Sequence, residues 1–470
     1  MELRPMSRLV IISNRVSVPT SDVGGAQGGL SVALAAALRE STGIWFGWSG
    51  EETAHFSGHI NFQRNFGVTT ATIDLEAQDI DEYYNGYANR TLWPLFHYRV
   101  DLAEFERGFA GGYERVNARF ADTVAPLIEA EDLVWVHDYH LIPLGQKLRE
   151  RGCRNRIGFF LHIPWPPTPL LLSLPSHREL VQSVFAYDVV GFQTLDSLEA
   201  FRDYARVQLD AEFGEDGSVT HEGRTIRAIA CPIGIDTAEF RASATSEVAL
   251  GVFERMRLSA NGRTMIIGVD RLDYSKGLEE RFLGYERFLG SHPDQHGAVF
   301  LLQIAPPSRA DVQSYQEIRA HLDALSGRIN GEFADAEWVP IRYVNKGHRR
   351  DQLAGMYRAA RIGLVTPLRD GMNLVAKEYV AAQDPADPGV LILSRFAGAA
   401  EQLVDALLIN PHSPEDMADA IATALAMPLA ERIARWRRLM DNIEAEDVIW
   451  WRRRFTEALE AARPHPLPPG

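Results

Sequence analysis

The feature that most constrains this chain is a recurring unit: a short apolar run, then a polar or glycine-bearing loop, then a helical pattern. Apolar runs of strand length flanked in this way are typical of parallel strands that are buried on both faces. Strands that alternate with helices predict an α/β fold of parallel sheets covered by helices on both sides. The runs are Leu9–Ile12, Leu133–Val136, Ile157–Leu161, Val189–Phe192, Met265–Val269, Val299–Ile304, Val339–Val344, Ile362–Val365, Val390–Leu393 and Leu407–Ile409.

This many runs in 470 residues suits two doubly wound domains better than one. The segment Cys231–Asp236 contains a proline and a glycine, which predicts that it joins the two domains. Residues 1–232 would then form an N-terminal domain and residues 233–445 a second one. Residues 446–462 are expected to form a helix that crosses back to the first domain. The proline-rich end, 463–470, is expected to be disordered.

The formal net charge is −15, which argues against nucleic acid or an anionic membrane as a partner, because both require a basic face. Cys153 and Cys231 lack metal-ligand spacing and are interpreted as thiols in a reducing compartment. We see no signal-peptide pattern and no apolar run as long as a membrane span. A cytoplasmic location is therefore expected.

Polar, charged or glycine-rich segments follow six of the predicted strands. In open α/β sheets, ligands bind beyond the carboxyl ends of the strands, so these segments are expected to line a cleft between two facing domains. The segments are Ser13–Arg15 with Gly28 and Gly29, His137–His140, His162–Pro164, Asp270–Gly277, Ala305–Arg309 and Arg369–Gly371.

Each of these segments also has an ordinary structural interpretation. His162 could be a satisfied core histidine, and Arg271 and Lys276 could be solvated loop charges. The pair Gly28-Gly29 could be a plain turn. His137 and His140 resemble metal ligands, but no acidic partner completes a site, so no metal is expected.

The segment from Ile362 to Tyr379 combines a buried strand, a loop and a helix start. Backbone N–H groups at a helix start favour anions, and Gly371 allows a ligand to approach the backbone closely. If the helix begins soon after Gly371, Asp370 and Glu378 lie about two turns apart. One carboxylate could hold sugar hydroxyls and the other a ribose, although an ordinary strand-to-helix turn has the same pattern.

Cationic side chains are placed to hold two separate phosphate groups. Arg271 and Lys276 share one loop of the second domain, where fixed cations would stabilise a departing pyrophosphate. Arg15, with the hydroxyl of Tyr84 and the indole N–H of Trp93, suits a second, smaller phosphate. Partly buried core aromatics are the alternative interpretation of Tyr84 and Trp93.

At these residues the chain resembles the trehalose-6-phosphate synthases, which are retaining glycosyltransferases with the GT-B architecture. The resemblance runs from about Ser7 to about Arg454 and depends on many motifs in order. They are S-N-R, G-G-L, W-F-G-W-S-G, D-E-Y-Y-N, L-W-P-L-F-H-Y-R, H-D-Y-H-L, F-F-L-H-I-P, P-I-G-I-D, R-L-D-Y-S-K-G, Q-I-A-P-P-S-R, G-R-I-N-G and P-L-R-D-G-M-N-L-V-A-K-E-Y.

The resemblance implies two Rossmann-like domains that face each other across a deep cleft. It implies transfer of glucose from a nucleotide-glucose, usually the UDP sugar, to glucose 6-phosphate. The product would be α,α-trehalose 6-phosphate, with the anomeric configuration retained. It also implies a homo-oligomer, either a dimer or a tetramer, and small-molecule substrates as the partners.

The resemblance further implies a role for each matching residue. The acceptor-binding residues would be Arg15, Trp48, Tyr84, Trp93, Asp138 and Arg309. The donor-binding residues would be Gly29, His162, Arg271, Lys276, Asp370, Gly371, Met372, Asn373, Leu374, Val375 and Glu378, with Glu378 on the ribose. The catalytic residues would be Asp138, His162, Arg271, Lys276 and Asp370.

A double displacement requires a carboxylate nucleophile on the far face of the donor sugar. Asp138 is the candidate in the first domain, and the resemblance puts it beside the acceptor instead. We therefore hypothesise front-face substitution, in which the leaving phosphate takes the acceptor proton while the Asp370 loop holds the oxocarbenium-like sugar. Arg271 and Lys276 would replace the metal that other glycosyltransferases use, so no cofactor is expected.

Two alternatives stay open within the same class. Glucosylglycerol-phosphate synthases and the pseudo-glycosyltransferases of aminocyclitol pathways share this fold and many of its motifs. A catalytically silent regulatory subunit is a third alternative, against which Asp138, Arg271, Lys276 and Glu378 are all present. The preferred nucleotide is left open, as is the extent of domain closure.

Overall fold

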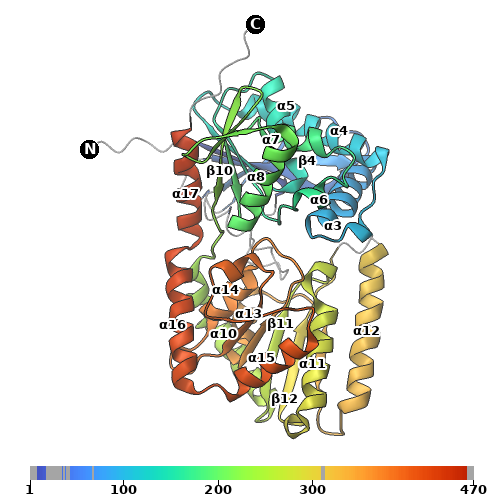
Figure 1. Cartoon of the computed structure of the whole chain (residues 1–470), viewed down its shortest axis with the longest axis vertical. Coiled ribbons are helices and arrows are strands. Elements are labelled where there is room, and N and C mark those ends of the chain that lie inside the picture. The colour runs from blue at the N-terminus through green and yellow to red at the C-terminus, as the bar shows by residue number, and fades with distance from the viewer. Residues whose placement is uncertain are drawn as a thin grey trace, which may run out of the picture. The chain divides into compact units, whose positions relative to one another are not determined.

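The structure, a computed structural model, describes residues 8–16, 34, 38, 43–65, 68–308 and 313–462. The chain divides into two compact units (Figure 1). The first unit is made of the chain up to Pro232 and of the C-terminal part from Trp451. The second unit runs from Ile233 to Trp450. Each unit contains one β-sheet, and the two sheets are not joined by any described strand pair.

The described sheet of the first unit has the strand order β3-β4-β2-β1-β5-β6-β7-β10-β9-β8. Its strands from β4 to β10 run parallel, whereas β3, β9 and β8 pair antiparallel at the two edges. The strands are β1 (Leu9–Arg15), β2 (Gly43–Thr53), β3 (Asn61–Asn65), β4 (Val68–Glu76), β5 (Leu133–His137), β6 (Ile157–Phe160), β7 (Val189–Phe192), β8 (Glu212–Phe213), β9 (Ser218–His221) and β10 (Arg224–Ala230). The central strands β5, β6 and β7 are buried along their whole length, as their continuous apolar runs predict.

The described helices of the first unit cover this sheet, and the short π- and 3-10 helices carry the letter η. They are α2 (Ala77–Asp79), the π-helix η1 (Ile80–Leu92), α3 (Trp93–Phe96), η2 (Val100–Leu102), α4 (Arg107–Val124), η3 (Ala125–Leu127), η4 (Tyr139–Leu141), α5 (Leu144–Glu150), α6 (Thr168–Leu171), α7 (His177–Val184) and α8 (Leu195–Leu209).

The last helix, α17 (Val448–Ala461), begins in the second unit and packs on the sheet of the first. The ring of Phe455 stacks on Trp135 of β5 with centroids 4.6 Å apart, and Trp451 lies beside the same indole. Glycines in the sheet make room for this helix. A Cβ on Gly158 or Gly191 would lie within 3 Å of the Phe455 ring, so larger residues there would displace α17.

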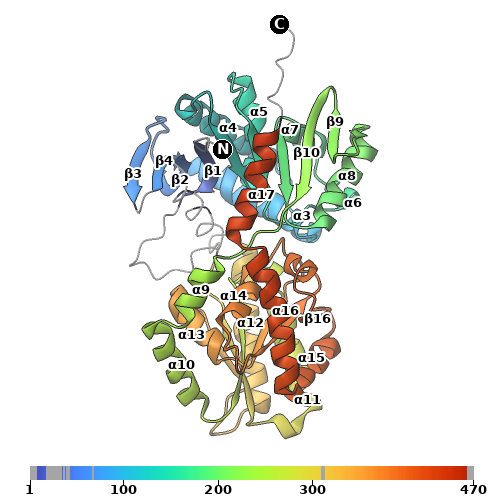
Figure 2. The same ribbon diagram turned by 90° about the vertical axis from the view of Figure 1, so that its left-hand side faces the viewer.

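The described sheet of the second unit is entirely parallel, in the order β13-β12-β11-β14-β15-β16. The strands are β11 (Thr264–Val269), β12 (Val299–Ile304), β13 (Ile341–Val344), β14 (Ile362–Val365), β15 (Val390–Ser394) and β16 (Leu407–Ile409). Figure 2 shows α10 and α13 on one side of this sheet and α11 and α15 on the other. The helices are α9 (Thr237–Ala244), α10 (Glu247–Ala260), η5 (Tyr274–Lys276), α11 (Leu278–Ser291), η6 (Pro293–Gln295), α12 (Gln313–Phe333), α13 (Arg350–Ala359), α14 (Leu374–Ala382), η7 (Gly398–Glu401), α15 (Pro414–Ala426) and α16 (Leu429–Ala445).

All ten apolar runs of the sequence form strands, with small errors at the ends. The run from Val339 was predicted too long, because β13 begins at Ile341 and Val339 is exposed. Leu161 likewise lies beyond the end of β6. The apolar runs did not include β2, β3, β4 and β10, whose alternating, polar or glycine-containing sequences do not form continuous apolar runs. In the part of the chain that is described, no helix is long and apolar enough to cross a membrane.

Candidate active site

In the second unit, the loops that follow β11 and β14 are joined to each other. The backbone N–H of Leu368 donates to the carbonyl of Ser275 at 2.8 Å. Gly277 has a φ of +62°, and a Cβ there would lie 2.1 Å from the carbonyl oxygen of Thr366. A side chain at Gly277 would therefore separate the two loops.

This junction brings together Lys276 and Asp370, two of the predicted catalytic residues. The Nζ of Lys276 lies 2.6 Å from Oδ2 of Asp370, and both side chains are largely buried. The Nδ2 of Asn373 donates to the same carboxylate oxygen at 3.1 Å. Arg271 follows β11 and is exposed to solvent. The two joined loops thus bring the Asp370 carboxylate and the cations of Arg271 and Lys276 to the ends of β11 and β14.

The backbone of this loop is held by its neighbours as well as by side chains. The N–H of Asp370 donates to Phe396 O at 3.1 Å, and Gly398 N–H donates back to Asp370 O at 3.0 Å. Asn373 has a φ of +94° and caps α14 by accepting from the N–H of Ala376 at 3.1 Å. Such fixed geometry favours binding because little order is lost when a ligand arrives.

The helix α14 begins at Leu374, soon after Gly371, so Asp370 lies in the loop before it and Glu378 in its second turn. The carboxylate of Glu378 is partly buried, which raises its pKa to about 7. The guanidinium of Arg350, with Nε 3.8 Å away, opposes that increase. The predicted residues Gly371 and Met372 are buried, and Leu374 and Val375 lie in the first turn of α14.

In the first unit, three predicted acceptor residues form one cluster. The guanidinium of Arg15, at the end of β1, lies 5.6 Å from the ring centroid of Trp48 in β2. Trp48 meets Tyr84 of η1 edge-on, with centroids 5.5 Å apart. Ser13 and Asn14 anchor this end of β1, because Ser13 accepts from Trp45 Nε1 at 2.8 Å and Asn14 from the Tyr83 hydroxyl at 2.7 Å. Arg15 alone of the S-N-R motif remains exposed.

Trp93 belongs to the same aromatic series and is buried to about the same degree as Trp48. Its ring packs on Tyr139, and Tyr139 packs on His140, which in turn stacks on Tyr84. Trp93 is only 5 % exposed. The interpretation of Trp93 as a buried aromatic therefore agrees with its position, whereas Tyr84 is only half-buried.

Asp138 and His162 are held against each other where β5 and β6 end. Asp138 has a φ of +75°, a conformation that non-glycine residues adopt only when their surroundings impose it. Its N–H donates to Phe160 O at 2.8 Å, and its Oδ1 accepts from the N–H of His162 at 3.2 Å. The geometry thus fixes the direction of the Asp138 carboxylate.

The imidazole of His162 lies in a chain of side-chain hydrogen bonds that the sequence analysis did not identify. Gln193 Nε2 lies 3.1 Å from His162 Nδ1, and His162 Nε2 lies 3.0 Å from His137 Nδ1. An amide nitrogen only donates, so the proton of His162 is on Nε2. Burial lowers the pKa of His162 to about 3, so the ring is neutral at physiological pH. Gln193 follows β7, and the rule that sites follow strand ends could have found it.

Two predicted residues, Gly29 and Arg309, lie outside the described residues. Within the described part of the chain, no three side chains of the metal-binding types form a cluster. His137 and His140 face different neighbours, since His137 contacts His162 and His140 stacks on Tyr84.

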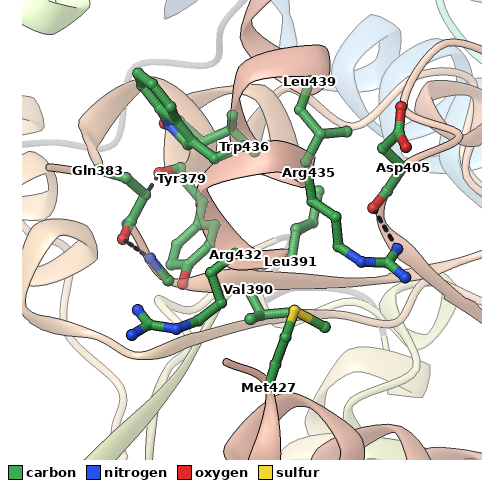
Figure 3. A pocket seen from close by; sticks show the side chains of 12 residues that line it. Tyr379, Gln383, Val390, Leu391, Asp405, Met427, Arg432, Arg435, Trp436 and Leu439 are labelled. Carbon is green, nitrogen blue, oxygen red and sulfur yellow. Dashed lines mark hydrogen bonds between the residues drawn. The ribbon is translucent and has the colours of Figure 1, made fainter. Parts of the chain in front are cut away.

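A crevice away from these loops lies between α14, β15 and α16 (Figure 3). Its cations are already engaged. Nη1 of Arg432 donates to Asp387 at 2.7 Å, and Nη1 of Arg435 donates to the carbonyl of Asp405 at 3.0 Å. The indole N–H of Trp436 donates to a carbonyl of α14 at 3.0 Å. The crevice is therefore interpreted as a helix-packing gap and not as a substrate site.

The family model of glycosyltransferase family 20 matches residues 8–461. This chain belongs to glycosyltransferase family 20. It is 49% identical over 459 residues to a trehalose-6-phosphate synthase of Sinorhizobium fredii, covering 97% of this chain and 99% of that protein. The predictions of a glycosyltransferase and of a resemblance to the trehalose-6-phosphate synthases are therefore confirmed.

Two solved structures of relatives are similar in fold as well as in sequence. One is an α,α-trehalose-phosphate synthase (UDP-forming) from Burkholderia xenovorans in complex with glucose-6-phosphate, with a TM-score of 0.93, 48% identity, and 97% of this chain and 100% of that one covered. The other is an Escherichia coli structure bound with UDP-2-fluoro glucose. It has a TM-score of 0.93 and 44% identity, and the match covers 98% of this chain and 100% of that one. The predicted fold class, with two parallel-sheet α/β domains of the GT-B type, is confirmed.

Proposed function

We propose that this chain transfers glucose from UDP-glucose to glucose 6-phosphate and forms α,α-trehalose 6-phosphate with retention of configuration and without a metal ion. The observation that carries the proposal is the contact of Lys276 with Asp370 at 2.6 Å, which joins a cation and a carboxylate at the ends of two parallel strands. A nucleotide-sugar donor requires this combination, because its pyrophosphate needs positive charge and its sugar hydroxyls need acceptors.

The donor would be held by the second unit. Lys276 and Arg271 would neutralise the pyrophosphate, and the N–H groups at the start of α14 would add to this field. Asp370, with Asn373 behind it, would accept hydrogen bonds from the glucose hydroxyls. Glu378 would accept from the ribose. Gly29 would lie near the pyrophosphate, as the resemblance implies.

The acceptor would be held by the first unit. Arg15 would pair with the phosphate of glucose 6-phosphate, together with Tyr84 and Arg309. Trp48 would line the acceptor-sugar side by holding Arg15 and Tyr84 in place, because it packs on both and is itself buried. Trp93 would act by supporting this aromatic series, since its ring is buried.

The reaction would proceed by front-face substitution. The C1–O bond to the pyrophosphate breaks first, and the charge on the leaving oxygen is stabilised by Lys276 and Arg271. The leaving phosphate oxygen then takes the proton of the acceptor hydroxyl as the new C1–O bond forms on the same face. His162 is neutral and its ring nitrogens contact Gln193 and His137, so it would shape the donor-sugar side of the site and not transfer the proton.

Asp138 is the carboxylate that a double displacement would use as its nucleophile. Its Oδ1 accepts a hydrogen bond from the backbone N–H of His162, and we propose that Asp138 orients the acceptor. Mass spectrometry of the enzyme with a slow donor such as UDP-2-fluoro glucose tests this role. A covalent glucosyl adduct on Asp138 would replace front-face substitution by double displacement.

A donor panel tests the overall reaction. UDP-, GDP- and ADP-glucose are each incubated with glucose 6-phosphate in EDTA, and the products are read by mass and by NMR of the anomeric protons. We expect an α,α-linked disaccharide phosphate with UDP-glucose. Product only after a divalent metal is restored would contradict the metal-free mechanism. Product only with glycerol 3-phosphate or an aminocyclitol phosphate would change the acceptor.

We further propose a cytoplasmic enzyme that forms a dimer or a tetramer. Cys153 and Cys231 are both free thiols, which suits a reducing compartment. Light scattering on the purified protein measures the assembly, and a monomer at micromolar concentration would contradict the second part of the proposal.

A further inference from the structure

A fully buried lysine that the proposed mechanism does not use lies on α14, next to Glu378. Lys377 has no exposed surface, and its Nζ donates to the carbonyl of Ile233 and to Oε1 of Gln402, each at 2.8 Å. Burial lowers the pKa of Lys377 to about 7, and the nearby carboxylate of Glu446 opposes that decrease. A buried ammonium group is costly unless it is well paired, so these contacts are specific.

Lys377 is linked to the two described places where the chain passes between the units, directly at Ile233 and through Gln402 at Glu446. Ile233 is the first residue of the second unit after Pro232. Glu446 lies in the break between α16 and α17, shortly before the chain returns to the first unit after Trp450. Gln402 connects the two, because its Nε2 donates to the Glu446 carboxylate while its Oε1 accepts from Lys377. We call Ile233–Thr237 and Glu446–Trp450 the two crossing segments.

The crossing segments are also attached directly to each other. The N–H of Val448 donates to the carbonyl of Ile235 at 3.1 Å. A Cβ on Gly234 would lie 2.4 Å from the carbonyl oxygen of Glu446, so the two backbones are in close contact. The Oγ1 of Thr237 donates to Ile443 O at 3.2 Å. Lys377 thus contacts a single connected structure, not two independent loops.

The same helix carries the proposed donor contacts. Asn373 caps α14 beside Asp370, and Glu378, one residue after Lys377, is the proposed ribose ligand. An α-helix moves as a nearly rigid body, so ordering its first turns by a ligand also orders the Lys377 ammonium group. The route from the donor to the crossing segments is then α14, Lys377 and Gln402.

We propose that Lys377 is a positioning residue that couples donor binding on α14 to the order of the two crossing segments. The inference rests on the proposed donor site. Donor binding stiffens the segments through which the chain passes between its units, and the crossing segments in turn hold α14 in its binding position. By the same coupling, a change that loosens the crossing segments weakens donor binding.

Hydrogen exchange measured by mass spectrometry, with and without UDP, tests the coupling. In the wild-type protein we expect UDP to slow amide exchange in peptides that cover 232–240 and 443–450. In Lys377→Met, which keeps the chain volume but removes the donors, that slowing is lost. The donor KM rises about tenfold, because both hydrogen bonds of the Lys377 amine are lost, while the acceptor KM is unchanged.

Lys147→Met is the matched control, because Lys147 is an α5 surface lysine whose Nζ pairs with Glu114 at 2.9 Å. It should leave both the exchange pattern and the donor KM as in the wild type. If Lys377→Met does not fold, Gln402→Leu breaks the link to Glu446 and leaves the bond to Ile233, and it should lose the UDP effect at 443–450.

Calorimetry of UDP binding distinguishes a wrong donor site from a wrong coupling role. If UDP does not bind the wild-type protein, the donor assignment itself is wrong. If UDP binds and exchange in the crossing segments is unchanged, or if Lys377→Met lowers only the melting temperature, the coupling role of Lys377 is refuted.

Discussion

Replacement of Gly50 by alanine tests the acceptor cluster most sharply. Gly50 lies in β2 with a φ of +96°, and a Cβ there would be 2.2 Å from Nη2 of Arg15. Ordinary contact begins at 3.4 Å, so the guanidinium must move by 3.4 − 2.2, or about 1.2 Å. A displacement of this size at a binding group can reduce turnover by roughly 10²-fold. We expect acceptor kcat/KM to fall by roughly 10- to 100-fold.

The backbone strain of Gly50→Ala must be separated from the displacement of Arg15. Gly58→Ala is the matched control, because Gly58 also has a positive φ, of +69°, but its Cβ would meet no described atom within 4 Å. Each variant should lose about 1–2 kcal/mol of unfolding free energy, measured in urea. Only Gly50→Ala should raise the acceptor KM, and neither should change the donor KM.

Equal acceptor kinetics in the two alanine variants would refute the reasoning. Arg15 would then either tolerate the move or not bind the acceptor phosphate. A variant Arg15→Ala distinguishes these outcomes, because it leaves the acceptor KM unchanged only in the second case.

Three further predictions concern the donor side. Arg271→Ala and Lys276→Ala should each reduce kcat by about 10²-fold or more, since both remove a preorganised charge from the leaving group, and near-normal turnover in either would contradict its role. The pKa of Glu378 is raised to about 7, so the fraction of Glu378 that is ionised increases from pH 6 to pH 8. At saturating acceptor, the donor kcat/KM of the wild type should rise over this pH range, and that of Glu378→Gln should stay flat. A rise in both proteins would show that Glu378 does not cause the pH dependence. The pKa of Lys377 is about 7 in the folded state and near 10.5 in the unfolded state, so the unfolded state binds more protons between pH 7 and pH 10.5. The unfolding free energy of the wild type, relative to that of Lys377→Met, should therefore rise from pH 7 to pH 9.5 in urea titrations. A difference between the two proteins that does not change with pH would show that Lys377 keeps its ordinary pKa.

Much of the architecture could be predicted because its signals are local. A run such as Ile362–Val365 is apolar on both faces of a strand, and this already implies a buried parallel sheet. The polar residues that follow such runs lie at the edge where ligands bind, which is why Lys276 and Asp370 were both found. Strands with mixed composition, such as β2 and β4, were missed because they are only partly buried along their length and lack that signal.

The amino-acid order thus determines most of the strands and the residues at the strand ends, since each depends on neighbours along the chain. The contacts that give those residues their chemistry depend on the fold. Lys276 meets Asp370 across 94 positions, and Lys377 reaches Ile233 across 144. Nothing near Lys377 in the sequence distinguishes it from a surface lysine. Its burial, its lowered pKa and its links to the crossing segments, directly at Ile233 and through Gln402 to Glu446, have one cause. Tertiary packing removes water and brings a distant backbone carbonyl and a distant side chain to its amine.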